Sequence, residues 1–226
     1  MAISFKGFPP EGLTFLRRLK RNNNREWFQA HKDVYEEKLK APMTELVLAL
    51  GGAMQGFAPE MEAEPQKAIY RIYRDIRFSS DKTPYKTHIA AIFAPRGMSK
   101  NTSASLYFHV APDEVVIAGG IYMPDAAALR ALRRHIAAQW EELRDILEKR
   151  GFKRLFGGLE GERLSRVPAG FSADHPAADL LRYKQLYVYA GESAEFARTA
   201  RLFPRLVKVF AAAMPLVRYL NRGLRQ

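Results

Sequence analysis

The sequence predicts one α+β domain spanning residues 1–226, with a largely antiparallel sheet, a central hairpin and helices at both ends. Apolar residues recur at helical spacing near both termini and alternate at strand spacing in the middle of the chain. No Gly/Ser-rich or Pro-rich linker separates these segments. With 47% hydrophobic residues, the chain has enough apolar material for one sizeable core.

Two helices are predicted at the N-terminal end. The first begins at residues 9–11 (Pro-Pro-Glu), because proline suits a first turn and an acid complements the positive end of a helix, and it ends at Asn22. The second follows Asn24, an expected N-cap, and its apolar stripe continues to Leu50. Pro42 should end or kink this second helix.

Strands are predicted in the middle of the chain. Residues 68–73 and 87–93 are rich in β-branched and aromatic side chains, and residues 74–84 between them should form a loop. The clearest hairpin pairs residues 103–110 with residues 115–122, since apolar and polar side chains alternate in its first arm. The middle of the chain therefore predicts a largely antiparallel sheet.

The second half of the chain returns to helices. Residues 119–120 (Gly-Gly) should mark a bulge or a close backbone approach. Residues 124–125 (Pro-Asp) begin the longest helical pattern, which ends at Gly151. A last strand is expected at residues 186–189, and helices follow it to the C-terminus.

Composition limits the chemistry. The absence of cysteine excludes disulfides and thiolate nucleophiles and fits a reducing compartment. The N-terminal residues lack the apolar core of a signal peptide and no apolar run could span a bilayer, so we expect a cytoplasmic protein without a membrane partner. The net charge of +12 favours anionic partners, although a solvated surface rich in arginine has the same charge balance.

Residues 71–88 form a dense segment of basic and aromatic side chains. Between residues 67 and 100, eight basic residues face only two acids, Asp75 and Asp81. Arginine offers a planar fork for phosphate or carboxylate, and lysine adds a compact charge. We therefore expect this segment to bind an anionic small molecule. Its expected ligand-binding residues are Arg71, Arg74, Arg77, Ser79, Asp81, Lys82, Tyr85 and Lys86.

Catalysis is left open by the sequence. The candidates within the segment are Tyr85 and His88, which can donate or accept a proton, and Asp75, which can orient neighbouring cations. None of the five histidines has the sequence spacing of a metal site, so no metal is expected, although His88 and His109 could meet as a pair on neighbouring strands. No P-loop pattern is present, and neither a cofactor nor an oligomeric state is indicated.

Two alternatives to a small-molecule site remain. The overall positive field could bind nucleic acid, provided that a continuous basic surface joins residues 71–88 to the C-terminal helix. The segment could instead be a buried clasp of ion pairs with a structural or protein-interaction role, in which case removing Asp75 or Arg77 should unfold the chain. Trp27 could stack on a ligand in the same cleft or pack in the core.

A family resemblance rests on this segment. The run R-I-Y-R-D-I-R followed by F-S-S-D-K-T-P-Y-K-T-H closely resembles the signature of domain-of-unknown-function family 2461. N-N-N-R-E-W-F at residues 22–28, Y-F-H-V at residues 107–110 and G-G-I-Y-M-P at residues 119–124 agree with it, so the resemblance spans nearly the whole chain. It implies one α+β domain and brings no activity, cofactor or catalytic residue.

Overall fold

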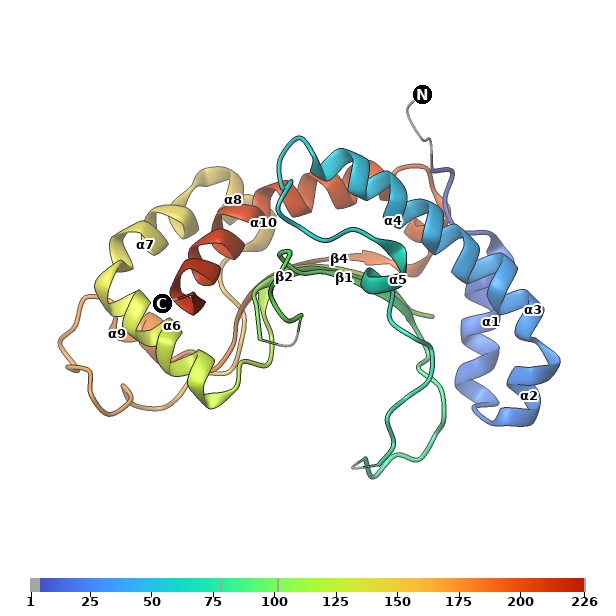
Figure 1. Ribbon diagram of the computed structural model, residues 1–226, viewed down its shortest axis with the longest axis horizontal. Helices are drawn as coiled ribbons and strands as arrows, with labels where there is room; N and C mark the ends of the chain where they lie inside the picture. Colours follow the sequence, from blue (N-terminus) through green and yellow to red (C-terminus); the bar gives the residue numbers. More distant parts are fainter. Residues whose placement is uncertain (1–4, 78, 101, 226) are drawn as a thin grey trace. The chain divides into compact units, whose positions relative to one another are not determined.

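The computed structural model describes residues 5–77, 79–100 and 102–225 (Figure 1). It has an α+β fold, in which helices precede and follow a four-stranded antiparallel sheet of strand order β1-β2-β3-β4, and this confirms the predicted fold class. The strands are β1 (Ile89–Phe93), β2 (Ser105–Val110), β3 (Glu114–Ile121) and β4 (Leu186–Ser193).

The helices fall into an N-terminal and a C-terminal group. The first group comprises α1 (Pro10–Arg21), α2 (Arg25–Ala30), α3 (Lys32–Tyr35), the π-helix η1 (Glu36–Lys40), α4 (Ala41–Met54) and α5 (Pro65–Ala68). The second comprises α6 (Ala126–Ala138), α7 (Trp140–Glu148), α8 (Arg150–Phe156), α9 (Ala178–Leu181), the 3-10 helix η2 (Ala194–Arg198) and α10 (Leu202–Leu224).

The N-terminal helices confirm the predicted start signals. Helix α1 begins at Pro10, and the side chain of Asn24 caps α2 by accepting a hydrogen bond from the Trp27 amide at 2.9 Å. The predicted second helix is divided into α2, α3, η1 and α4. Pro42 lies in the first turn of α4 and has no amide to donate, so the widened π-helical turn precedes it instead of a regular α-helical turn.

The predicted strand at residues 68–73 is wrong. Residues 65–68 form the short helix α5, and only Ile69 and Tyr73 make isolated antiparallel bridges, to Ala91 and Tyr85. The chain before residue 74 does run antiparallel to the chain after residue 84, but single hydrogen bonds connect the two arms instead of a continuous ladder. Residues 74–77 and 79–84, which the structure describes, form neither helix nor strand, in agreement with the predicted loop.

The hairpin of β2 and β3 was predicted correctly. In β2, Leu106, Phe108 and Val110 are buried on one face, whereas Tyr107 and His109 point to the other face and are half-buried. The long helical pattern of residues 124–151, by contrast, is interrupted twice. At the first interruption the carbonyl group of Gln139 accepts a hydrogen bond from the Tyr219 hydroxyl at 3.1 Å.

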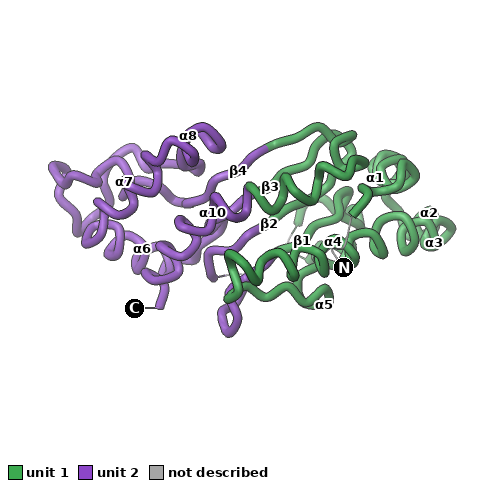
Figure 2. The backbone as a smooth tube through the Cα atoms, turned by 90° about the horizontal axis from the view of Figure 1, so that it is seen from above, with its two compact units in different colours: residues 1–92, 107–117, 191–208 green, residues 93–106, 118–190, 209–226 purple. Residues whose placement is uncertain are grey.

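The chain forms two compact units (Figure 2). Unit 1 comprises residues 1–92, 107–117 and 191–208, and unit 2 comprises residues 93–106, 118–190 and 209–226. Because each unit is assembled from separate segments, there is no single boundary at which a linker could stand in the sequence. A bilayer crossing needs a long apolar helix, and within the described residues none qualifies.

Candidate anion-binding site

Tyr85 anchors the 71–88 segment to the N-terminal helices of unit 1. Its ring is 2% exposed and stacks on Phe28 with 4.1 Å between the ring centroids. The side chain of Asn23 donates to the Tyr85 carbonyl at 2.9 Å and accepts from the Tyr85 amide at 3.1 Å. Tyr85 was expected to contact a ligand or to transfer a proton, but its covered side chain packs in the core. We therefore leave it out of the proposed site.

Arg74 is held within the segment. Its guanidinium group pairs with the Asp81 carboxylate and donates to the hydroxyl groups of Thr83 at 2.7 Å and Ser79 at 3.4 Å. The Thr83 amide and Arg74 donate to Asp81 and lower the pKa of its carboxyl group to about 2. Arg74 therefore forms hydrogen bonds with Ser79 and Asp81, which were also expected to bind the ligand.

Arg77 and Asp75 form a second pair at the tip of the segment. The guanidinium group donates to the Asp75 carboxylate from Nε at 3.0 Å and from Nη2 at 2.7 Å. These hydrogen bonds from Arg77 lower the pKa of Asp75 to about 2. The side chains are 76% and 45% exposed, respectively, so this pair is not the buried clasp that the structural alternative required.

Because this pair is exposed, Asp75→Ala and Arg77→Ala should each leave the melting temperature of the protein unchanged within error. Differential scanning calorimetry at pH 7 is the measurement. An unfolded variant, or a large fall in melting temperature, would instead support the clasp.

The two lysines of the segment contact backbone carbonyl groups. Lys82 donates to the carbonyl of Ile76 at 3.0 Å. Lys86 donates to the carbonyl of Arg71 at 2.8 Å, and its ammonium group lies 5.0 Å from the centroid of the Tyr70 ring. Lys82 thus lies at the arginine end, whereas Lys86 belongs to the opposite end, next to β1.

His88, immediately before β1, meets His109 of β2, with 5.1 Å between the ring centroids. Both rings are half-buried, and the His109 side chain is 17% exposed. Within the described chain the His88 ring has no hydrogen-bond partner. The predicted meeting of these two histidines therefore occurs.

His109 is oriented by two further side chains. The Tyr107 hydroxyl lies 3.0 Å from His109 Nδ1, and a Glu114 carboxylate oxygen lies 3.8 Å from Nε2. Burial raises the pKa of Tyr107, so its hydroxyl stays protonated at neutral pH and can donate to Nδ1. The hydrogen of His109 is then on Nε2, which faces the negatively charged carboxylate of Glu114.

His88 is kept neutral by its surroundings. Burial, the neighbouring His109 and the positive charge of Lys86 lower the pKa of His88 to about 4. The structure describes no group of three or more His, Cys, Asp or Glu side chains that could hold a metal ion. What this end of the segment offers is therefore an ammonium group and a half-buried imidazole beside a second imidazole.

Of the five residues at this end, two were identified as site residues from the sequence, one was noted in another role and two were not identified. Lys86 and His88 were expected, and His109 was noted only as a possible metal partner. Tyr107 and Tyr70 were missed as neighbours of these residues, although the half-buried face of β2 was visible in its alternation. Phe78, within the family motif, lies outside the described residues.

These features define an α+β protein with a basic-aromatic segment at residues 71–88. At one end of the segment the arginines pair with acids of the same segment, and at the other end His88 meets His109 of the sheet. The family model described as "Conserved hypothetical protein (DUF2461)" matches residues 11–219, so the chain belongs to this family. The match confirms the resemblance seen in the sequence. No curated protein matches the chain.

Proposed function

We propose that the protein binds a small ligand bearing a phosphate or carboxylate group at the histidine end of the 71–88 segment. The site comprises Lys86, His88 and His109, and Tyr70 and Tyr107 flank it. The observation that carries the proposal is the half-buried His88 ring, whose centroid lies 5.1 Å from that of His109. Burial, the neighbouring His109 and the charge of Lys86 lower the pKa of His88 and keep it neutral. A bound anion would reverse this effect, because it stabilises the imidazolium form.

The arginine end of the segment is less favourable for an anion. Arg74 and Arg77 already have carboxylate partners within the segment, so an anion would have to displace Asp81 or Asp75. At the histidine end the Glu114 carboxylate faces His109. The positive charge of Lys86 acts on His88, so we place the anion on the side of the group that these two residues occupy.

Proton uptake should accompany anion binding. In the free protein His88 has a pKa of about 4, below the ordinary imidazole value of about 6.5. The folded state therefore binds fewer protons than the unfolded chain between these values, and stability falls as the pH is lowered through this window. A bound anion within about 4–6 Å should raise the pKa of His88 by about 1–3 and offset part of that loss.

The test uses sulfate, whose charge is constant between pH 5 and pH 8, titrated by calorimetry at fixed ionic strength with chloride as the background anion. We expect sulfate to bind about tenfold more tightly at pH 5 than at pH 8, because the ligand selects the protonated His88. Lys86→Met and His88→Asn should each weaken binding at pH 5, whereas the exposed Lys32→Met control should not.

Two results would contradict the proposal. One is sulfate binding that is absent or insensitive to pH in the wild-type protein. The other is binding that Lys82→Met weakens and Lys86→Met or His88→Asn does not, because this pattern would move the anion to the arginine end.

A further inference from the structure

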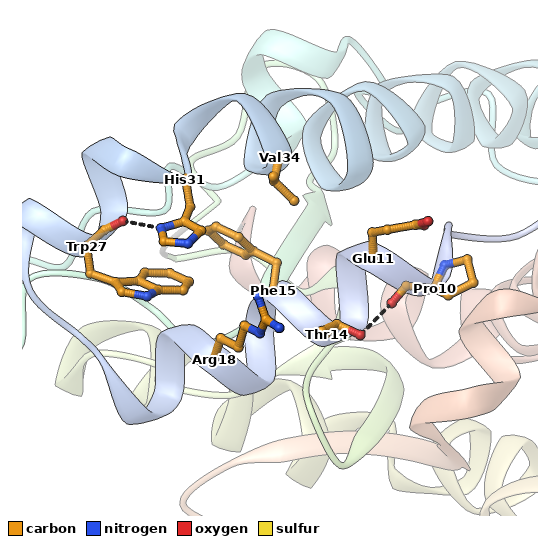
Figure 3. Close-up of a pocket in the computed structure, with 8 residues that line it drawn as sticks. All are labelled: Pro10, Glu11, Thr14, Phe15, Arg18, Trp27, His31 and Val34. Atoms are coloured by element: carbon orange, nitrogen blue, oxygen red, sulfur yellow. Dashed lines mark hydrogen bonds between the residues drawn. The ribbon is translucent and has the colours of Figure 1, made fainter.

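A cleft lies among the N-terminal helices of unit 1. It encloses about 330 Å³ between α1 and the α2–α3 pair, a volume at the lower end of small-ligand pockets (Figure 3). The cleft shares no residue with the anion-binding site. Its lining residues are Pro10, Glu11, Thr14, Phe15, Arg18, Trp27, His31 and Val34.

One wall of the cleft is aromatic and pre-arranged. The Trp27 and His31 rings are stacked, with 4.1 Å between their centroids and an interplanar angle of 16°. His31 Nδ1 lies 2.8 Å from the Trp27 carbonyl oxygen, and a dashed line marks this hydrogen bond in Figure 3. Because a carbonyl oxygen can only accept, Nδ1 carries the hydrogen. The ring is thus fixed, and its Nε2 atom is left for another partner. Phe15 extends from α1 toward this wall, with 5.4 Å between the centroids of the Phe15 and Trp27 rings.

The opposite wall is the exposed side of α1, which carries opposite charges at its two ends. Glu11 and Arg18 lie seven residues apart, so they fall on the same face of the helix. Neither has an ion-pair partner among the residues that the structure describes, whereas the adjacent Arg17 pairs with Glu195 at 2.8 Å. Within the described residues, the cleft therefore has an unpaired acid at one end and an unpaired base at the other.

Backbone packing holds this charged wall in place. A Cβ atom added to Gly12 would lie 2.5 Å from the Lys38 carbonyl oxygen, so α1 approaches η1 as closely as a glycine permits. Phe15 and Leu16 of α1 are 3% and 0% exposed, which ties the same helix to the core. The spacing of Glu11 and Arg18 along the cleft is thus set by a rigid helix.

That spacing matches a short peptide. Seven residues of α-helix extend about 10.5 Å at 1.5 Å per residue. An extended chain of two or three residues spans about 7–10 Å. We propose that the cleft binds a free peptide of two or three residues, with its ammonium terminus at Glu11, its carboxylate terminus at Arg18, and an aromatic or apolar side chain against Trp27.

The experiment titrates the tripeptide Ala-Phe-Ala in free, N-acetylated and C-amidated forms. The protein contains two tryptophans, so the Trp140→Phe background makes Trp27 the only fluorescent tryptophan. We expect the free tripeptide to change Trp27 fluorescence, and each capped form to bind at least about fivefold more weakly, because each cap removes a charge-assisted contact.

The variants assign each terminus to its side chain. C-amidation should no longer matter in Arg18→Gln, and N-acetylation should no longer matter in Glu11→Gln. Arg21→Gln removes the same charge from α1 outside the cleft and should behave as the unsubstituted protein does. Each titration compares ligands on one folded protein, so altered stability of a variant does not obscure the comparison.

Three results would overturn the proposal. They are no fluorescence change with the free tripeptide up to millimolar concentration, equal binding of the free and capped forms, and binding of benzoate or phenylethylamine alone as tightly as the tripeptide. Because the two sites have no residue in common, this outcome is independent of the sulfate titrations.

Discussion

Tyr85→Ala should lower the free energy of unfolding by about 3–5 kcal/mol, as expected for truncation of a buried aromatic ring. The ring is 2% exposed and lies between Phe28, at 4.1 Å, and Tyr73, at 5.4 Å between centroids. Alanine would leave a cavity where the segment is attached to the N-terminal helices. Urea unfolding monitored by circular dichroism measures the effect.

Tyr85→Phe is the matched control for this substitution. The Tyr85 hydroxyl has no hydrogen-bond partner within the part of the chain that the structure describes, so removing it should change stability by less than about 1 kcal/mol. If alanine is tolerated as well as phenylalanine, then Tyr85 does not anchor the segment and the description of the site is wrong.

Gly120→Ala should be the most damaging substitution of a glycine in the sheet. Gly120 has a φ of 130°, a conformation that costs a residue with a Cβ atom about 1–3 kcal/mol. An added Cβ atom would also lie 2.6 Å from the Tyr187 Cα atom and would collide with the Leu186 carbonyl oxygen of β4. Strain and collision together should lower the melting temperature by many degrees, as measured by calorimetry.

Gly191 provides the control in the same sheet. It lies in β4, a Cβ atom added there meets nothing within 4 Å, and its φ is not positive. Gly191→Ala should therefore be neutral or slightly stabilising. Equal melting temperatures for the two alanine variants would show that the close approach of β3 and β4 at Gly120 is not as described.

The parts of the fold predicted from the sequence are those set by neighbouring residues. Helix α1, the Asn24 cap and the β2–β3 hairpin follow from proline, capping and alternation signals within a few residues. The strand predicted at residues 68–73 does not form. Its β-branched and aromatic composition favours a strand, but a strand also needs a partner with which to form a continuous ladder of hydrogen bonds. Its neighbour, residues 84–91, bonds to it only at intervals.

The candidate site, too, was visible in the sequence only where neighbouring residues define it. The charge of residues 71–88 was visible in the sequence, but which cations face which acids depends on how the loop folds back, as Arg74 does on Asp81. The meeting of His88 and His109 depends on strand pairing across 21 positions of sequence. The position of Trp27 at the edge of a cleft depends on the packing of α1 against α2, which no local signal specifies.

The most direct test of the central claim is an NMR titration of the His88 ring with and without sulfate. Without the anion, we expect a pKa of about 4 for His88. Saturating sulfate should raise this pKa by about 1–3, and Lys86→Met should reduce the increase. A His88 pKa near 6.5 in the free protein, or a pKa that sulfate leaves unchanged, would contradict the account.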